Sequence, residues 1–125
     1  MGDGNIRVLV VDDDPVCRLA LRRALEKAGL KVQDAADVAS ACESIETGGA
    51  DVMVLDYQLG DETGLHVWEY ARQSNSNLAR RTIMLTGVLD APERMQMSDS
   101  TQIPVMGKPF DGEILAHMVT RLAGE

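Results

Sequence analysis

Two stretches of this chain are continuously apolar and end in aspartate. The run Val8–Val11 (VLVV) leads into Asp12, and the run Val52–Leu55 (VMVL) leads into Asp56. A strand with one solvent-exposed face alternates between apolar and polar residues. An unbroken run rich in β-branched side chains therefore indicates a parallel strand that is buried on both faces. The two runs predict two strands of a parallel sheet, each with a carboxylate at its carboxyl end.

The rest of the chain alternates such strands with helical patterns. A half-buried strand is expected at Leu30–Ala35, a buried strand at Thr82–Leu85 and a short strand at Ile103–Met106. Five strand–helix repeats of these lengths suit right-handed crossovers, so we predict an α/β fold, a doubly wound (βα)5 sandwich around one five-stranded parallel sheet. Helices are expected after the N-caps Asp14, Asp37 and Asp111 and from Gly64, with Gly29 ending the first.

The segment from Val88 to Gln102 has the weakest pattern. Its apolar residues lack a clear helical spacing, so only a short, mobile helix is expected there. We expect Met95 and Met97 to fill the core. Pro104 removes one backbone donor from the following strand, which suits a strand at the edge of the sheet.

The apolar stripes of the helices predict which side chains are buried. Leu19 belongs to the apolar face of the first helix, Trp68 to the inner face of the third, and Ile114 to the stripe of the last. The two cysteines, Cys17 and Cys42, fall inside helical segments and form no CxxC pair. Both are therefore expected to be buried, reduced thiols.

The charge balance limits the kinds of partner. The chain has 12 basic and 20 acidic side chains, a net charge of −8, and only one Phe, one Trp and two Tyr to stack on bases. No direct contact with nucleic acid is therefore expected. No stretch approaches the apolar length of a membrane span, and no signal-peptide pattern opens the chain. We therefore expect no membrane insertion and a cytoplasmic location.

Polar side chains follow four of the predicted strands. Asp12 and Asp13 follow the first strand, Asp56 the third, Thr86 the fourth and Lys108 the fifth. The carboxyl ends of parallel strands share one edge of the sheet, where open α/β sheets bind their ligands. Clustered carboxylates repel one another unless a cation relieves them, and they suit a hard cation such as Mg²⁺. A carboxylate beside such a metal can attack a phosphoryl group, whose oxygens an ammonium and a hydroxyl can contact.

The ordered set of motifs resembles the receiver domain of two-component response regulators, over residues Ile6 to Leu122. The motifs that carry the resemblance are VLVVDDDP (8–15), DVMVLD (51–56), IMLTG (83–87) and KPF (108–110). The resemblance implies a single receiver domain over residues 1–125, with a core of about 6–122, and the flavodoxin-like strand order 2-1-3-4-5. It implies a phosphoacceptor in a phosphorelay and not a dedicated enzyme, although such a domain can remove its own phosphoryl group.

By this resemblance Asp56 takes a phosphoryl group from the phosphohistidine of a sensor histidine kinase or a histidine phosphotransfer domain. Asp13 ligates Mg²⁺, for which Mn²⁺ can substitute, and Asp12 orients the ion, partly through water. Asp56 and the backbone carbonyl of Gln58 complete the protein ligands. Asp14 has no such role in the family and is expected only to cap a helix.

The same resemblance implies how the domain switches. Thr86 senses the phosphoryl group and Lys108 pairs with it, which biases a two-state element for which residues 88–102 are the candidate. The face formed by the fourth helix, fifth strand and fifth helix then acts on an output partner of unknown identity. The resemblance leaves open whether the chain is a stand-alone regulator or the receiver of a hybrid histidine kinase or longer regulator.

Two residues depart from the family pattern. The family often has an aromatic residue three positions before the lysine, where this chain has Val105. The usual coupling of that aromatic to Thr86 is therefore not expected, and a helix or loop rearrangement without it stays open. Gly60 stands where the family often has proline, which predicts a more flexible loop.

Two other functions agree with parts of the sequence. Residues 12–16 (DDDPV) match the DxDx[TV] signature of haloacid-dehalogenase-type phosphatases, with Asp12 as nucleophile and Asp14 as acid/base. In that case Asp56 is unexplained, and no acidic pair follows Lys108 on a further strand. The second alternative is a receiver-like interaction module that works without phosphorylation, although the motif residues are all intact.

Overall fold

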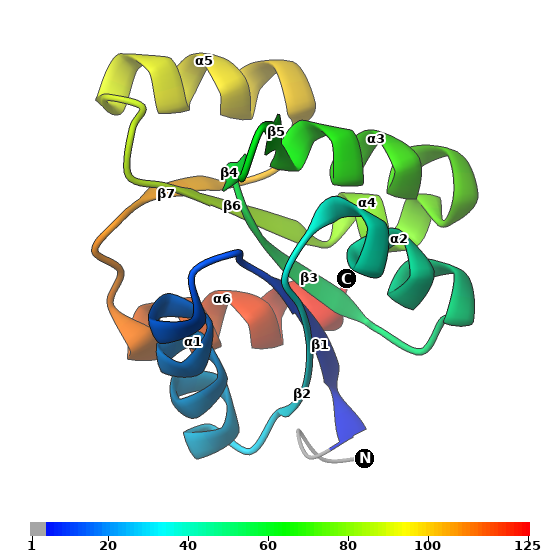
Figure 1. The fold of residues 1–125 in the computed structure, drawn as a ribbon. Helices are drawn as coiled ribbons and strands as arrows, with labels where there is room; N and C mark the ends of the chain where they lie inside the picture. Colours follow the sequence, from blue (N-terminus) through cyan, green and yellow to red (C-terminus); the bar gives the residue numbers. More distant parts are fainter. Residues whose placement is uncertain (1–4) are drawn as a thin grey trace.

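In the computed structural model, residues 5–125 are described, and a parallel sheet lies between layers of helices (Figure 1). Neighbouring strands of this sheet are all parallel, in the order β2-β1-β3-β6-β7. Numbered along the chain, this is the predicted order 2-1-3-4-5, so the predicted fold class is confirmed. The five strands are β1 (Arg7–Val11), β2 (Lys31–Ala35), β3 (Val52–Asp56), β6 (Thr82–Thr86) and β7 (Val105–Gly107).

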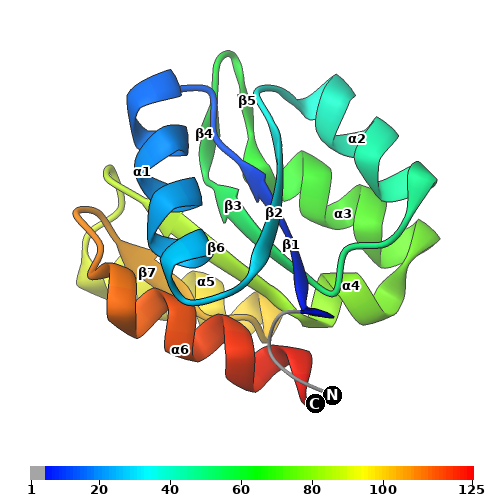
Figure 2. The same ribbon diagram turned by 90° about the horizontal axis from the view of Figure 1, so that it is seen from below.

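Helices cover both faces of the sheet. α1 and α6 lie on one face and α2, α3 and α4 on the other, while α5 lies beside the edge strand β7 (Figure 1, Figure 2). None of the helices within residues 5–125 is both long and apolar enough to cross a membrane. The helices are α1 (Pro15–Lys27), α2 (Val38–Thr47), α3 (Gly64–Ser74), α4 (Ser76–Arg80), α5 (Ala91–Thr101) and α6 (Gly112–Ala123).

The continuous apolar runs form the middle of a two-sided core. All side chains of Val8–Val11 and Val52–Leu55 are 0% exposed. Successive side chains enter opposite layers, so Leu9 packs in the cluster beneath α2 and α3, whereas Val10 packs with α1 and α6. Burial of each such side chain contributes about 1.5–3 kcal/mol. Both faces of these strands are therefore apolar, as the sequence predicted.

The predicted helix starts are confirmed. The carboxylates of Asp14, Asp37 and Asp111 each accept a backbone N–H from the first turn of α1, α2 and α6, respectively. Gly64 is the first residue of α3. Gly29, with φ +88°, follows the end of α1 in the left-handed conformation that glycine adopts without cost.

Two short elements were missed by the sequence analysis. The helix α4 follows α3 directly, is capped by Asn75 and buries Leu78 and Ala79. A two-residue hairpin of β4 (Gln58–Leu59) and β5 (Glu62–Thr63) fills the loop after β3. Both elements are shorter than the windows over which helical or strand periodicity can be detected.

Three apolar side chains predicted to be buried are at the surface instead. Leu19 is 46% exposed, Ile114 is 54% exposed and Met95 is 67% exposed. Leu19 and Ile114 lie on helices whose apolar positions span a wider arc than the face that meets the sheet. Met95 lies on α5, of which no residue is buried. The predictions for Met97 and Trp68 hold, because both pack against the core cluster.

Two further predictions were only partly correct. Cys17 and Cys42 carry free thiols, but each is partly and not fully buried. Pro104 does not lie inside the last strand, because β7 begins at Val105. The carbonyl of Pro104 still accepts the Met84 N–H, and β7 is an edge strand as predicted.

Candidate functional site

Three carboxylates meet at the carboxyl edge of the sheet. One ligand oxygen from each of Asp12, Asp13 and Asp56 lies within 4.8 Å of the other two. The sheet register explains their proximity, since Val11 of β1 is paired with Leu55 of β3, and Asp12 and Asp56 are the next residues of the chain after this pair. Asp12 is 0% exposed and Asp56 is 6% exposed, whereas Asp13 lies at the surface.

Lys108 reaches these carboxylates from the far end of the chain. Its Nζ lies 3.2 Å from Oδ2 of Asp12 and 3.2 Å from Oδ2 of Asp56. One ammonium group thus pairs with two nearly buried carboxylates. The third carboxylate, Asp13, leaves the cluster with an excess of negative charge.

The charges at this site change the pKa values of two side chains. Burial and the neighbouring carboxylate of Asp12 raise the pKa of Asp56 to about 6, although Lys108 opposes the shift. Burial disfavours the charged form of Lys108, but the two carboxylates outweigh this effect and raise the pKa of Lys108 above its ordinary value. Asp56 is therefore mostly ionised at neutral pH, and Lys108 stays positively charged.

Backbone groups fix the orientation of the buried carboxylates. Oδ1 of Asp12 accepts the N–H of Asp14 at 2.9 Å, and Oδ1 of Asp56 accepts the N–H of Gln58 at 3.3 Å. In both cases the chain turns back over the carboxylate immediately after the strand ends. These bonds leave Oδ2 of each carboxylate to Lys108.

Gly60 ties the hairpin loop to the outermost carboxylate. Its N–H donates to Oδ2 of Asp13 at 3.0 Å, and its φ is +64°. A proline has no N–H, and its φ is locked near −65°, so it can provide neither feature. Gly60 thus gives Asp13 a hydrogen bond that a proline at this position cannot make.

Thr86 borders the cluster at the end of β6. It is 1% exposed, and its Oγ1 accepts the N–H of Val88 at 3.1 Å and of Leu89 at 3.4 Å. The hydroxyl therefore holds the loop between β6 and α5. The backbone carbonyl of Thr86 accepts the N–H of Lys108 at 2.8 Å, and this bond joins the ends of β6 and β7.

Two residues of α1 that the sequence analysis did not select also reach this site. Nη1 of Arg18 donates to the backbone carbonyl of Asp12 at 2.7 Å. Burial and the carboxylate of Asp12 raise the pKa of the Cys17 thiol to about 11. Both residues lie in the first turn of the helix that directly follows the aspartate triplet, and this nearness in the sequence could have identified them.

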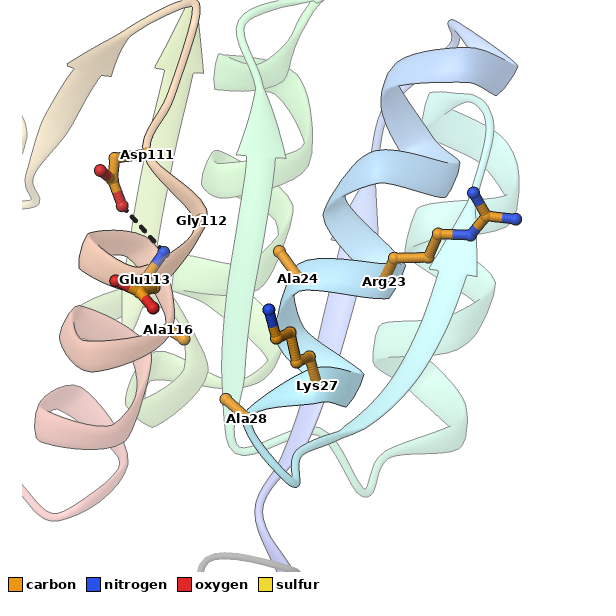
Figure 3. A pocket seen from close by; sticks show the side chains of 8 residues that line it. All are labelled: Arg23, Ala24, Lys27, Ala28, Asp111, Gly112, Glu113 and Ala116. Atoms are coloured by element: carbon orange, nitrogen blue, oxygen red, sulfur yellow. Dashed lines mark hydrogen bonds between the residues drawn. The ribbon is translucent and has the colours of Figure 1, made fainter.

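A separate groove of about 660 Å³ lies between α1 and α6 (Figure 3). It is lined by small side chains and by charged residues of both signs, among them Arg23, Lys27 and Glu113. None of the clustered carboxylates and no part of Lys108 lines it. The cluster is therefore a separate acidic site at the edge of the sheet and is not part of this groove.

A family model described as the response regulator receiver domain matches residues 8–120. The chain is a response regulator receiver domain. This membership favours the receiver domain over the phosphatase alternative. The carboxylate that this alternative used as acid/base, Asp14, instead caps α1 by accepting the N–H of Val16 at 3.0 Å.

Curated relatives of this receiver domain are about twice as long. The chain is 35% identical over 123 residues to the transcriptional regulatory protein TrcR of Mycobacterium tuberculosis. The matched region covers 98% of this chain and 46% of TrcR. The chain is also 35% identical over 115 residues to the response regulator MprA of Mycobacterium ulcerans, and this matched region covers 91% of this chain and 49% of MprA. The receiver domain thus spans about half the length of these relatives.

Solved structures of receiver domains superpose over nearly the whole chain. The Francisella response regulator 1452 receiver domain matches with a TM-score of 0.85 and 26% identity, over 96% of this chain and 98% of that one. The response regulator TrrA of Thermotoga maritima, in complex with Mg²⁺ and BeF, matches with a TM-score of 0.79 and 26% identity, over 94% and 98% of the two chains.

The donor set of the cluster fits a divalent, oxygen-preferring cation. Asp12, Asp13 and Asp56 offer only oxygen ligands, within 4.8 Å of one another. Mg²⁺ takes one or two carboxylates and keeps several waters, which suits a site whose outer ligand is at the surface. Receiver domains bind Mg²⁺ at an acidic site of this kind.

Proposed function

We propose that this receiver domain accepts a phosphoryl group on Asp56, with Mg²⁺ or Mn²⁺ bound beside it. One observation carries the proposal: the nearly buried carboxylate of Asp56 lies among two further carboxylates and 3.2 Å from the ammonium of Lys108. In this proposal Asp13, Asp56 and the backbone carbonyl of Gln58 hold the ion, and Asp12 orients it. The ion, when bound, neutralises negative charge on the incoming phosphoryl oxygens.

The chemistry follows from the ionisation of Asp56. Its pKa of about 6 leaves the carboxylate ionised at neutral pH, so it can act as a nucleophile without a general base. A carboxylate oxygen forms a bond to the phosphorus of a phosphohistidine while the phosphorus–nitrogen bond breaks. The bonding electron pair returns to the imidazole nitrogen. Lys108 supplies a fixed positive charge next to the transferred group.

Thr86 has the chemistry of a sensor for this group. Its oxygen accepts two backbone N–H groups of the loop before α5, and its own proton is a donor that a phosphoryl oxygen can accept. Phosphorylation adds a charge of about −1.5 to −2 and three strong acceptors beside this hydroxyl. A turn of the Thr86 side chain toward the phosphoryl group would move its oxygen away from the N–H groups of Val88 and Leu89.

The proposed donor is the phosphohistidine of a sensor histidine kinase or a histidine phosphotransfer domain. The proposed output surface is the face formed by α5, β7 and α6. The exposed apolar side chains of Met95 on α5 and Ile114 on α6 support this assignment, because exposed apolar side chains favour contact with a partner. The relatives, of which the chain spans about half, agree with the receiver part of a longer protein, and a stand-alone regulator is the alternative.

Incubation with acetyl phosphate and Mg²⁺, followed by intact-protein mass spectrometry, tests the proposal. The wild-type chain should gain one phosphoryl group, the Asp56→Asn variant none, and the Asp12→Asn variant one at a lower rate. Asp61→Asn, which changes an exposed aspartate of the hairpin that follows β3, should react like the wild type. Loss of labelling in Asp12→Asn together with full labelling in Asp56→Asn would favour the phosphatase alternative. A wild type that neither gains a phosphoryl group nor binds beryllofluoride would favour an interaction module that works without phosphorylation.

A further inference from the structure

The loop between β6 and α5 is held from two sides. On one side, Oγ1 of Thr86 accepts the N–H groups of Val88 and Leu89. On the other side, Nη1 of Arg94, in the first turn of α5, donates to the carbonyl of Leu89 at 2.8 Å. Both backbone polar groups of Leu89 are therefore hydrogen-bonded. Its N–H donates to Thr86, and its C=O accepts from Arg94.

The guanidinium of Arg94 also rests on the edge strand. A Cβ atom added to Gly107 would lie 3.1 Å from both Cζ and Nη1 of Arg94. Gly107 is the register partner of Thr86 and directly precedes Lys108. The contacts thus form a closed ring, from Thr86 through Leu89 and Arg94 to Gly107 and back to Thr86 across the sheet.

Few side chains of α5 pack against the core. No residue of α5 is buried, and Met97 is its one side chain packed against the described core clusters. The helix begins with a capping box of Asp90 and Glu93, which stabilises the helix itself but does not attach it to the sheet. Toward the other end of the helix, Oγ of Ser98 donates to the carbonyl of Ile103 at 2.8 Å, so the ring through Arg94 is what holds the N-terminal end of α5.

We propose that Arg94 is a positioning residue that couples the orientation of the Thr86 hydroxyl to the position of α5. In the arrangement seen here, Arg94 holds Leu89 where its N–H bonds to Thr86. If the Thr86 hydroxyl turns toward a phosphoryl group, the N–H groups of Val88 and Leu89 lose their acceptor, the loop rearranges, and the Leu89 carbonyl leaves Arg94. Arg94 thus stabilises the unphosphorylated arrangement. This inference rests on the proposed function, because it assigns the regulation of the same site.

The direction of the effect follows from a two-state equilibrium. A ligand that needs the minor arrangement binds with an apparent affinity reduced by the fraction of molecules in that arrangement. Loss of one charge-assisted hydrogen bond at a half-exposed position should change this fraction by about fivefold. Removing the Arg94 contact should therefore increase the affinity for a phosphoryl analogue, whereas a purely structural residue would leave it unchanged or lower it.

The test uses Arg94→Met, which keeps the apolar stem but removes the donors, and Gly107→Ala, which displaces the guanidinium without changing Arg94. Binding of beryllofluoride is titrated in saturating Mg²⁺, and hydrogen exchange of the Val88 and Leu89 amides is measured in the unligated protein. We expect each variant to bind beryllofluoride about fivefold more tightly and to lose about fivefold of the amide protection. Affinity for Mg²⁺ alone should not change, since Arg94 contacts none of the clustered carboxylates.

Two controls separate this coupling from general destabilisation. Arg23→Met, at an exposed arginine of α1, should leave both readouts unchanged. The double variant Arg94→Met/Gly107→Ala should behave like Arg94→Met alone, because Gly107→Ala acts through the group that is already missing. Unchanged exchange of Val88 and Leu89 in both single variants, or fully additive effects in the double variant, would overturn the inference. If the wild type binds no beryllofluoride, the proposed function fails, and the exchange measurement still decides whether Arg94 holds the loop.

Discussion

Lys108 and Asp56 are separated by 52 residues in the sequence, and their charged groups lie 3.2 Å apart at the carboxyl edge of the sheet. The same ammonium lies 3.2 Å from the fully buried carboxylate of Asp12. The ammonium of Lys108 thereby offsets the repulsion between the carboxylates of Asp12 and Asp56. The stability and metal affinity of the site therefore depend on the balance between this one ammonium and the three carboxylates.

Replacing Lys108 with methionine should weaken the fold and strengthen Mg²⁺ binding. Without the ammonium, two nearly buried carboxylates lose their partner, so the free energy of unfolding in EDTA should fall by about 1–3 kcal/mol. Because Lys108 also repels a bound cation, the affinity for Mg²⁺ should rise severalfold, as measured by calorimetry. Lys31→Met, at an exposed residue of β2, is the control and should change neither quantity. A fall in Mg²⁺ affinity in Lys108→Met would contradict the repulsion.

The raised pKa of Asp56 should make stability depend on pH. Between the ordinary value of 3.8 and the folded value of about 6, the folded state keeps a proton that the unfolded state releases. The free energy of unfolding therefore falls as the pH rises through this window, by on the order of 2–3 kcal/mol for this group. Urea unfolding in EDTA should show Asp56→Asn to be more stable than the wild type at about pH 8 and equal to it at about pH 4. An equal difference at both pH values would rule out this titration as the cause.

The aspartate triplet should divide into metal ligands and a helix cap. Asp13→Asn should lower the affinity for Mg²⁺ by about tenfold or more, because it removes a negative charge from the predicted ligand set. Asp14→Asn removes the same charge one residue later, but asparagine caps helices as well as aspartate does. Its Mg²⁺ affinity should stay within about twofold of the wild type, since Asp14 lies outside the carboxylate cluster. Equal losses in the two variants would mean that net charge, and not ligation, controls binding.

Gly64 should not tolerate a side chain. A Cβ atom at this position would lie 2.4 Å from the carbonyl oxygen of Asp56 and 3.0 Å from Sδ of Met84. Gly64→Ala should therefore push α3 away from β3 and lower the free energy of unfolding by about 2–4 kcal/mol. Gly87→Ala is the matched control, because its nearest neighbour would be 3.8 Å away, at Lys108. Chemical denaturation of both variants measures the difference, and similar midpoints would show that α3 can shift at little cost.

The sequence predicted which residues meet at the carboxyl edge of the sheet where their positions depend on strand ends. Asp12, Asp56 and Thr86 each follow or end an apolar run, so their place at one sheet edge follows from the parallel arrangement of the strands. Arg94, Arg18 and Gly107 could not be selected in this way. Their roles depend on where a helix side chain reaches another element, and no local periodicity encodes such contacts.

The sequence by itself determined the alternation of strands and helices, the helix caps and the set of polar residues at the strand ends. These are properties of neighbouring residues, since periodicity, capping and turn preference act over a few positions. Only the tertiary structure decided that one ammonium pairs with two of the carboxylates, that Gly60 donates to Asp13 and that Arg94 lies on Gly107. The physical reason is that burial and charge pairing depend on three-dimensional distance, and Lys108 meets Asp12 across 96 residues of chain.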